Sequence, residues 1–143
     1  MACSILLLIF IPFFSFSQWN YTEVVTSGLD VYRVADVKSD SSELSLQEYY
    51  GDVMFCLHDS TLVSDTKTII LEITYGLTTK TFLLKYLPIY DETLIISQNL
   101  KDENYFNYLE ISNTVKIFFP VESKCYQFDT RGLLSAYHYV LGI

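Results

Sequence analysis

An alternation of apolar and polar residues over positions 68–75, interrupted only by Ile70, constrains this chain more than any other part of its sequence. A period of two is typical of a half-buried β-strand. One face of this segment carries only apolar side chains, namely Ile69, Leu71, Ile73 and Tyr75. Residues 80–87 repeat the pattern with Phe82, Leu84 and Tyr86, and Pro88 ends that run. With residues 76–79 as the connecting loop, the two runs predict a β-hairpin.

Further strand patterns follow along the chain. Residues 105–111 and 114–119 flank the pair Ser112-Asn113, which suits a tight turn because Asn tolerates a positive φ. Weaker strand candidates cover residues 19–25, 30–35, 53–58, 93–98 and 124–128. About seven to nine short strands with no linker or repeat predict a single mainly-β domain, an antiparallel β-sandwich or barrel.

Two segments have helical features. Asp40 and Glu43 have the spacing of a capping box, which predicts a short helix from Asp40 through Tyr50, although Leu44 and Leu46 suit a strand equally well. The C-terminal segment is clearer, with apolar residues at helical spacing, Gly142 after them and Asp129 or Thr130 as the candidate N-cap. The apolar residues in question are Leu133, Tyr137, Val140 and Leu141.

The amino-terminal segment has the pattern of a cleaved secretory signal peptide. Residues 5–16 form an apolar block of about 12 residues, shorter than the roughly 20 that a membrane-spanning helix needs. Small residues at Ser15 and Ser17 predict cleavage before Gln18, so residues 1–17 are the predicted signal and residues 18–143 the β-rich domain. The ending resembles Gram-negative bacterial signals, which predicts a secreted or periplasmic protein. The absence of Lys and Arg before Glu23 departs from that pattern and leaves an uncleaved anchor as the alternative.

The charge of the chain excludes one class of partner. Its formal net charge is -8, with 17 Asp and Glu against 9 Lys and Arg, and all of it follows the predicted signal. Nucleic acids and anionic lipids are bound through their phosphates by basic surfaces. We therefore expect no nucleic-acid partner, and no integral membrane span after processing.

Processing removes Cys3 and leaves two cysteines, Cys56 and Cys125. An even pair in an exported protein makes them a candidate disulfide. Two separate thiols are the alternative, because free cysteine is commonly a core residue.

The sequence carries no recognisable catalytic, metal or cofactor motif. His58-Asp59-Ser60 contains triad residue types, but neighbours on a strand point to opposite faces, so we interpret it as a strand end and turn. The scattered acidic residues Asp36, Asp40, Asp59 and Asp65 match no regular calcium loop. The 5 glycines form no phosphate-binding pattern. We predict no cofactor and no metal, and the sequence favours a binding protein over an enzyme.

Aromatic residues are the most unusual feature of the composition, with 12 Tyr and 10 Phe. Tyrosine suits half-buried sheet faces and also binding surfaces, because its ring is apolar and its hydroxyl is polar. Two short runs make the best candidates for a surface that binds a glycan or a protein. They contribute Tyr86, Tyr90, Tyr105 and Tyr108.

Residues 108–141 place two strand-like runs before a terminal helix whose start carries Gly132 and Ala136, and Trp19 directly follows the leader. With these matches, the last part of the chain resembles small exported bacterial proteins of the invasion-associated locus B type. The resemblance implies an exported β-sandwich with a terminal helix and brings no catalytic residues with it.

These observations favour an exported, non-enzymatic β-sandwich module that binds a macromolecular partner or supports the cell envelope. The alternative is a small exported ligand-binding barrel or hydrolase with a cavity between the two predicted hairpins and His58 as a candidate polar group in it.

Overall fold

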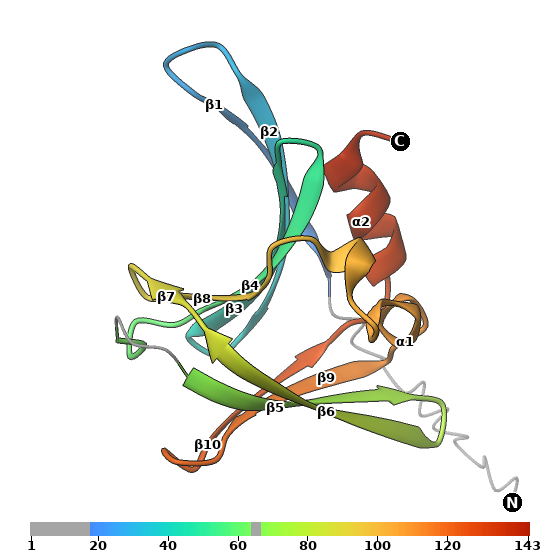
Figure 1. Cartoon of the computed structure of the whole chain (residues 1–143). Coiled ribbons are helices and arrows are strands. Elements are labelled where there is room, and N and C mark those ends of the chain that lie inside the picture. The colour runs from blue at the N-terminus through green and yellow to red at the C-terminus, as the bar shows by residue number, and fades with distance from the viewer. Residues whose placement is uncertain (1–17, 64–66) are drawn as a thin grey trace, which may run out of the picture.

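The fold is a sandwich of two antiparallel sheets with a C-terminal helix (Figure 1). The structure, a computed structural model, describes residues 18–63 and 67–143. Sheet A has the strand order β1 (Asn20–Val25), β2 (Val31–Ser39), β3 (Ser42–Tyr49), β4 (Asp52–His58), β8 (Thr93–Ser97) and β7 (Ile89–Tyr90). Sheet B has the order β10 (Lys124–Asp129), β9 (Thr114–Phe119), β5 (Lys67–Tyr75) and β6 (Thr78–Leu87). The predicted mainly-β antiparallel sandwich is confirmed.

Three short helices complete the domain: η1 (Leu100–Asp102), α1 (Phe106–Glu110) and α2 (Leu133–Leu141). Sheet B packs across one half of the inner face of sheet A, and α2 lies against the other half, on β2, β3 and β4 (Figure 1). The core therefore has two parts that share sheet A. Side chains that fill it include Leu44, Leu46, Phe55, Ile69, Leu71 and Ala136, each with no exposed surface.

The hairpin predicted from the alternating pattern is present. β5 and β6 pair antiparallel from Ile69–Leu84 to Tyr75–Thr78, and the turn is the two residues Gly76 and Leu77. The side chain of Asn113, in the loop between α1 and β9, accepts a hydrogen bond from the Gly76 backbone N–H at 2.9 Å and thereby fixes this turn.

The second predicted hairpin is wrong in its first strand. Residues 106–110 form α1, and β9 pairs instead with β5 and β10. Tyr105, Phe106 and Leu109 are all buried, as one face of a helix allows, whereas a strand would turn Phe106 to the face opposite Tyr105 and Leu109. On β9, alternate residues Val115, Ile117 and Phe119 are buried, as expected for a strand with one face on the core.

The predicted helix from Asp40 to Tyr50 is also wrong, because residues 42–49 form the strand β3. Leu44 and Leu46 lie two residues apart and are both fully buried, as a strand face requires. Gly51 has a φ of 87° in the tight turn to β4 and does not end a helix.

The predicted C-terminal helix is confirmed as α2, and Gly142 follows it with a φ of 76°. Its predicted cap is wrong. Gly132, with a φ of 87°, occupies the N-cap position without a side-chain cap. The Trp19 ring packs on Gly132, and its indole N–H donates to the Arg131 carbonyl at 3.1 Å.

The predicted signal peptide, residues 1–17, lies outside the described residues, as does Asp65. Within the part of the chain that the structure describes, no helix has the length and apolar character needed to cross a membrane.

Candidate binding groove

The four tyrosines predicted to form a binding surface do not lie on one surface. Tyr86 and Tyr90 are exposed, by 84% and 64% respectively. Tyr108 is half-buried, and Tyr105 has no exposed surface at all. The prediction for Tyr105 is therefore wrong, because its ring belongs to the core. Burial, reinforced by the nearby Glu103 carboxylate, raises the pKa of its phenol well above the ordinary value of 10.0.

Tyr108 belongs to a packed aromatic cluster beside the β5–β6 hairpin. It stacks on Tyr75 with ring centroids 5.6 Å apart and contacts Phe82 at 5.9 Å. The Lys80 ammonium lies 5.8 Å from the centre of the Tyr108 ring, within cation–π range. These contacts show that the Tyr108 ring packs against neighbouring side chains of its own chain. For Tyr86 and Tyr90, the binding role stays a prediction.

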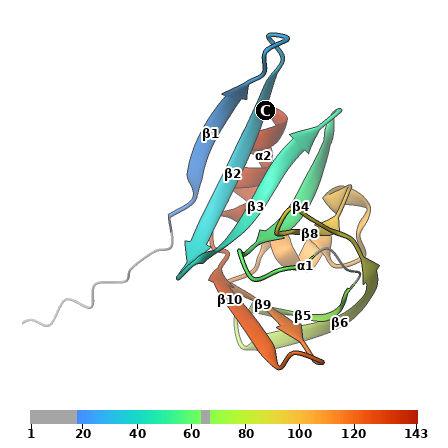
Figure 2. The same cartoon turned by 90° about the vertical axis from the view of Figure 1, so that its left-hand side faces the viewer.

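A different aromatic surface lies at the far end of sheet A, where the sheet divides. The pairing of β2 with β3 stops at Val34–Gln47. Beyond that point β2 pairs with β1 as far as Val31–Val25, and β3 pairs with β4 as far as Tyr49–Asp52. The two hairpin tips therefore diverge at the same end of the molecule (Figure 2).

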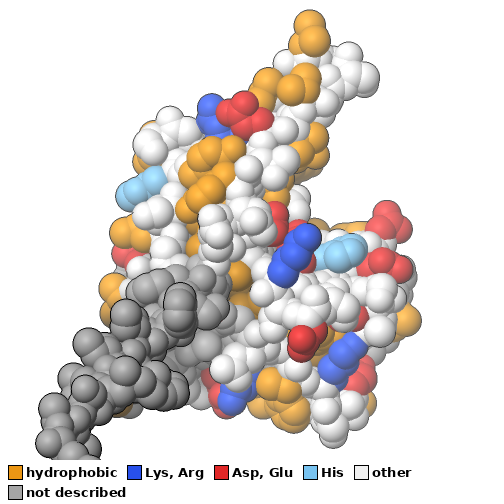
Figure 3. All heavy atoms as spheres, turned by 180° about the vertical axis from the view of Figure 1, so that it is seen from behind, with side chains coloured by type: hydrophobic (Ala, Val, Ile, Leu, Met, Phe, Trp, Pro, Cys, Tyr) orange, Lys and Arg blue, Asp and Glu red, His pale blue; other side chains and the backbone are white. Residues whose placement is uncertain are grey.

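A groove of about 580 Å³ lies between the two diverging arms, and we name it the fork groove. This size is within the range of ligand-binding recesses. Its lining residues are Thr26, Asp30, Val31, Tyr32, Gln47, Glu48, Tyr49, Tyr50 and Met54. Large exposed apolar side chains surround it, including Val25 and Leu29 on the β1–β2 arm, which carries apolar side chains to its tip (Figure 3).

Tyr50 is the most unusual residue of the fork groove. Its side chain is 89% exposed, and its ring meets Tyr49 edge-on with centroids 4.6 Å apart. Its φ is 51°, in the left-handed region that bulky residues rarely adopt. A two-residue hairpin turn favours Asn or Gly at this position. Sequence and backbone thus hold a large aromatic ring in solvent at a conformational cost.

The charge of the fork groove is negative. Its lining, as far as the described residues form it, includes the carboxylates of Asp30 and Glu48 and no Lys, Arg or His. The Glu48 carboxylate accepts a hydrogen bond from the Gly51 backbone N–H at 2.8 Å, which fixes the turn that carries Tyr50. Aromatic faces and carboxylates together are complementary to a cationic group.

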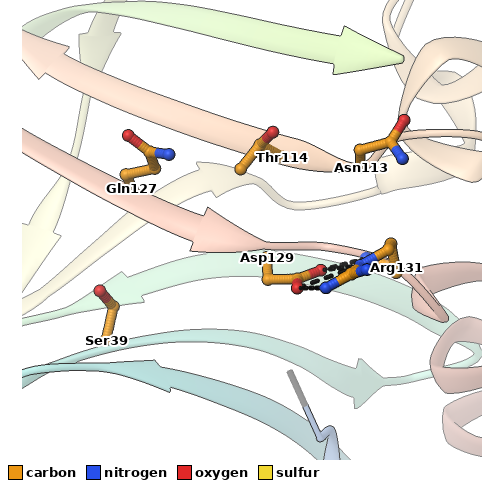
Figure 4. Close-up of a pocket in the computed structure, with 6 residues that line it drawn as sticks. All are labelled: Ser39, Asn113, Thr114, Gln127, Asp129 and Arg131. Atoms are coloured by element: carbon orange, nitrogen blue, oxygen red, sulfur yellow. Dashed lines mark hydrogen bonds and ion pairs between the residues drawn. The ribbon is translucent and has the colours of Figure 1, made fainter. Parts of the chain in front are cut away.

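A second recess, of about 530 Å³, is polar and lies where the β2–β3 turn approaches sheet B (Figure 4). It is lined by Ser39, Asn113, Thr114, Gln127, Asp129 and Arg131. Arg131 forms an ion pair with Asp129 through its Nε and Nη2 atoms. Because the two charges of this recess face each other, the recess offers polar groups without a net charge.

Lys124, Thr61 and Asp59 form the arrangement closest to a catalytic one. The Lys124 ammonium contacts the Thr61 hydroxyl and lies 3.4 Å from Asp59 Oδ1. Burial alone would lower the pKa of Lys124, but Tyr126 and Asp59 raise it overall. The Thr61 hydroxyl donates a hydrogen bond to Asp59 Oδ1, so the three side chains form one hydrogen-bonded network at the surface between the two sheets.

His58-Asp59-Ser60 forms the strand end and turn that its sequence predicts, since the Asp59 carbonyl accepts from the Leu62 N–H at 3.0 Å. His58 lies beside Thr93, with Nδ1 3.1 Å from Oγ1, and not beside Ser60. Residues 18–63 and 67–143 contain no group of three or more His, Cys, Asp or Glu placed to hold a metal ion.

The two cysteines of the described chain are free thiols. Cys56 is buried on β4 in sheet A, and Cys125 is exposed on β10 in sheet B. Burial raises the pKa of the Cys56 thiol to about 12.

The fork groove does not follow from sequence reasoning that treats residues 40–50 as a helix. The signal that could have identified it is Tyr49-Tyr50-Gly51 between two apolar runs, with two aromatic residues where turn residues are expected. No protein-family model matches the chain, and comparisons with curated proteins and with solved structures find no match.

Proposed function

We propose that this protein is an exported, non-enzymatic β-sandwich module that binds a macromolecular partner through the fork groove. The observation that carries the proposal is Tyr50, whose ring is 89% exposed on a left-handed backbone. Strained conformations persist where surrounding structure enforces them, and they cluster at functional sites. Export rests on the signal-like segment of residues 1–17.

Three further features support a binding role. The groove is bordered by exposed apolar side chains on both arms, and such patches mark interaction sites when polar residues rim them. Tyrosine is enriched at protein interfaces because it brings a large contact area and a polar tip. Both hairpins extend from sheet A, in which β2 and β3 pair up to Val34–Gln47, so a single sheet supplies both walls of the groove.

Site-specific photo-crosslinking in the source cell tests the proposal. A benzophenone amino acid replaces Tyr50 in one variant and Leu77 in a matched control, which is exposed in the hairpin turn between β5 and β6 of sheet B. We expect a discrete high-mass adduct from position 50 and none from position 77. Equal adducts from both positions, or none from position 50, would contradict binding through the groove.

N-terminal sequencing of the same material tests export separately. A mature chain that begins at Gln18 is the expected result. An intact Met1 on the purified protein would overturn the exported part of the proposal and leave the groove to be judged by crosslinking.

A further inference from the structure

The fork groove has walls made of strand backbone as well as side chains. Residues 31–33 of β2 pair with β1 on one side, and residues 48–49 of β3 pair with β4 on one side. On the sides that face the fork, these residues have no ladder partner within residues 18–63 and 67–143. Unpaired strand edges are templates for an added strand, because their N–H and C=O groups are presented in a row.

The side chains that line the fork groove along these edges favour a positively charged partner. Asp30 stands at the start of the β2 wall and Glu48 in the β3 wall, and no basic residue of the described chain lines the groove to neutralise them. The rings of Tyr32, Tyr49 and Tyr50 add aromatic faces, which attract ammonium and guanidinium groups. The chain as a whole carries a net charge of -8, which also favours the approach of a cationic partner.

We infer that the partner held in the fork groove is an extended peptide segment bearing Lys or Arg side chains. This inference rests on the proposed function and specifies the partner. The peptide backbone pairs with the open edge of β2 or β3, its cationic side chains reach Asp30 and Glu48, and their stems lie against the tyrosine rings. A neutral glycan would stack on the rings and donate hydroxyl hydrogen bonds to the carboxylates without the charge attraction, and an acidic peptide would be repelled.

Fluorescence anisotropy with synthetic hexapeptides tests this inference on the purified full chain. The probe alternates Lys and Thr, and its counterpart alternates Glu and Thr. We expect saturable binding of the Lys probe, at least about tenfold weaker binding of the Glu probe, and weakening of the former with salt. A Lys probe methylated on alternate backbone nitrogens, so that it loses donors along one edge, should bind at least about fivefold more weakly if its backbone pairs.

Variants identify the site. Asp30→Asn combined with Glu48→Gln removes both charges, while the new glutamine side chain keeps an oxygen that can accept from the Gly51 N–H. This double variant should weaken binding of the Lys probe at least about tenfold. Tyr50→Asn suits the left-handed turn and should weaken binding similarly without unfolding the arm. Leu77→Asn, in the exposed hairpin turn between β5 and β6, is the matched control and should leave binding unchanged.

The outcomes separate this inference from the proposed function. Cellohexaose serves as the neutral glycan probe. Equal binding of the Lys and Glu probes, or binding of cellohexaose but not of the Lys probe, would overturn the inference that the partner is a basic peptide. If position 50 still crosslinks a partner in that case, the groove remains the binding site. If neither peptide binding nor crosslinking at position 50 is observed, both the binding role of the fork groove and the basic-peptide partner are contradicted.

Discussion

Three large apolar residues stand exposed in the left-handed region: Leu29, Tyr50 and Tyr86. A side chain with a Cβ adopts this conformation at a cost of roughly 1–2 kcal/mol, which Asn reduces by local hydrogen bonding. Two of the three, Leu29 and Tyr50, lie at the hairpin tips that border the fork groove. Stability alone would not select these residues at these positions.

Replacing an exposed tyrosine by Asn measures the free-energy cost of its left-handed backbone conformation. Tyr86→Asn should raise the free energy of unfolding by about 1 kcal/mol. Tyr50→Asn should raise it less, because it also loses the edge-on contact with Tyr49. Urea denaturation of both variants beside the unmodified protein checks the order. Destabilisation by Tyr86→Asn would show that contacts of that ring outweigh its backbone strain.

Burial of the Cys56 thiol makes the free energy of unfolding depend on pH in the alkaline range. Its side chain is 1% exposed, and burial raises its pKa from 9.0 to about 12. Above pH 9 the unfolded chain releases this proton while the folded chain keeps it, so stability falls as pH rises through this window, by up to about 1.4 kcal/mol per pH unit. Tyr105, whose pKa is also raised from 10.0, adds to the loss at still higher pH.

Cys56→Ala should make the decline of unfolding free energy between pH 9 and about 11 shallower. Cys125→Ala is the control, since that side chain is exposed on β10. Denaturant titrations at several pH values give the slopes. Identical slopes for the unmodified protein and Cys56→Ala would contradict a buried, protonated thiol.

At the scale of elements, a hydrogen bond between two buried hydroxyl groups connects the end of α1 to the start of α2. The Ser112 hydroxyl follows α1, donates to the Leu109 carbonyl at 2.7 Å and lies 2.6 Å from the Thr130 hydroxyl, which precedes α2. Thr130 is fully buried. Since Ser112 donates to Leu109, Thr130 is the donor in the second hydrogen bond.

Thr130→Val removes that donor and should lower the free energy of unfolding by about 1–2 kcal/mol. Thr130→Ser keeps the hydroxyl and is the matched control, with a smaller loss from its missing methyl group. Thermal or urea unfolding compares the two. A Val variant as stable as the Ser variant would mean that the hydroxyl pair contributes nothing to holding α1 and α2 together.

The elements also explain which predictions succeeded. β5 and β9 present alternating apolar residues to the core from the middle of a sheet, so local pattern and tertiary burial agree, and these strands were predictable. Residues 105–111 were not, because Tyr105 and Leu109 share a face in a strand as well as in a helix, and the burial of the segment against the end of sheet B makes it helical. Residues 40–50 carry a capping-box spacing, but pairing with both β2 and β4 overrides it.

At the scale of the whole molecule, an ion pair between Asp59 and Lys124 connects the two sheets. Asp59, directly after β4 of sheet A, is 4% exposed and lies 3.4 Å from Lys124 at the start of β10 in sheet B. Burial alone would raise the pKa of Asp59, but hydrogen bonds from Thr61 and the Lys124 charge lower it below 3.8. This contribution to stability is present above about pH 4 and is lost as pH falls through the lowered pKa.

Asp59→Asn should lower the free energy of unfolding at neutral pH by about 1–2 kcal/mol, a value kept small because Lys124 is partly exposed. The difference from the unmodified protein should shrink as pH falls from about 5 to about 2. Glu72→Gln is the matched control, since its pair with Lys116 at 3.8 Å lies on the surface of one sheet and should be worth less than about 0.5 kcal/mol. Equal effects of the two substitutions would contradict a role for Asp59 in joining the sheets.

The sequence by itself determined the fold class, the strands with a period of two and the C-terminal helix. These depend on local periodicity and residue type, which the chain carries wherever its segments come to lie. Only the tertiary structure decided that Tyr105 is buried, that Tyr50 is exposed and that β2 and β3 part beyond Val34–Gln47. Those outcomes depend on which strands pair and where pairing stops, and long-range contacts alone fix both.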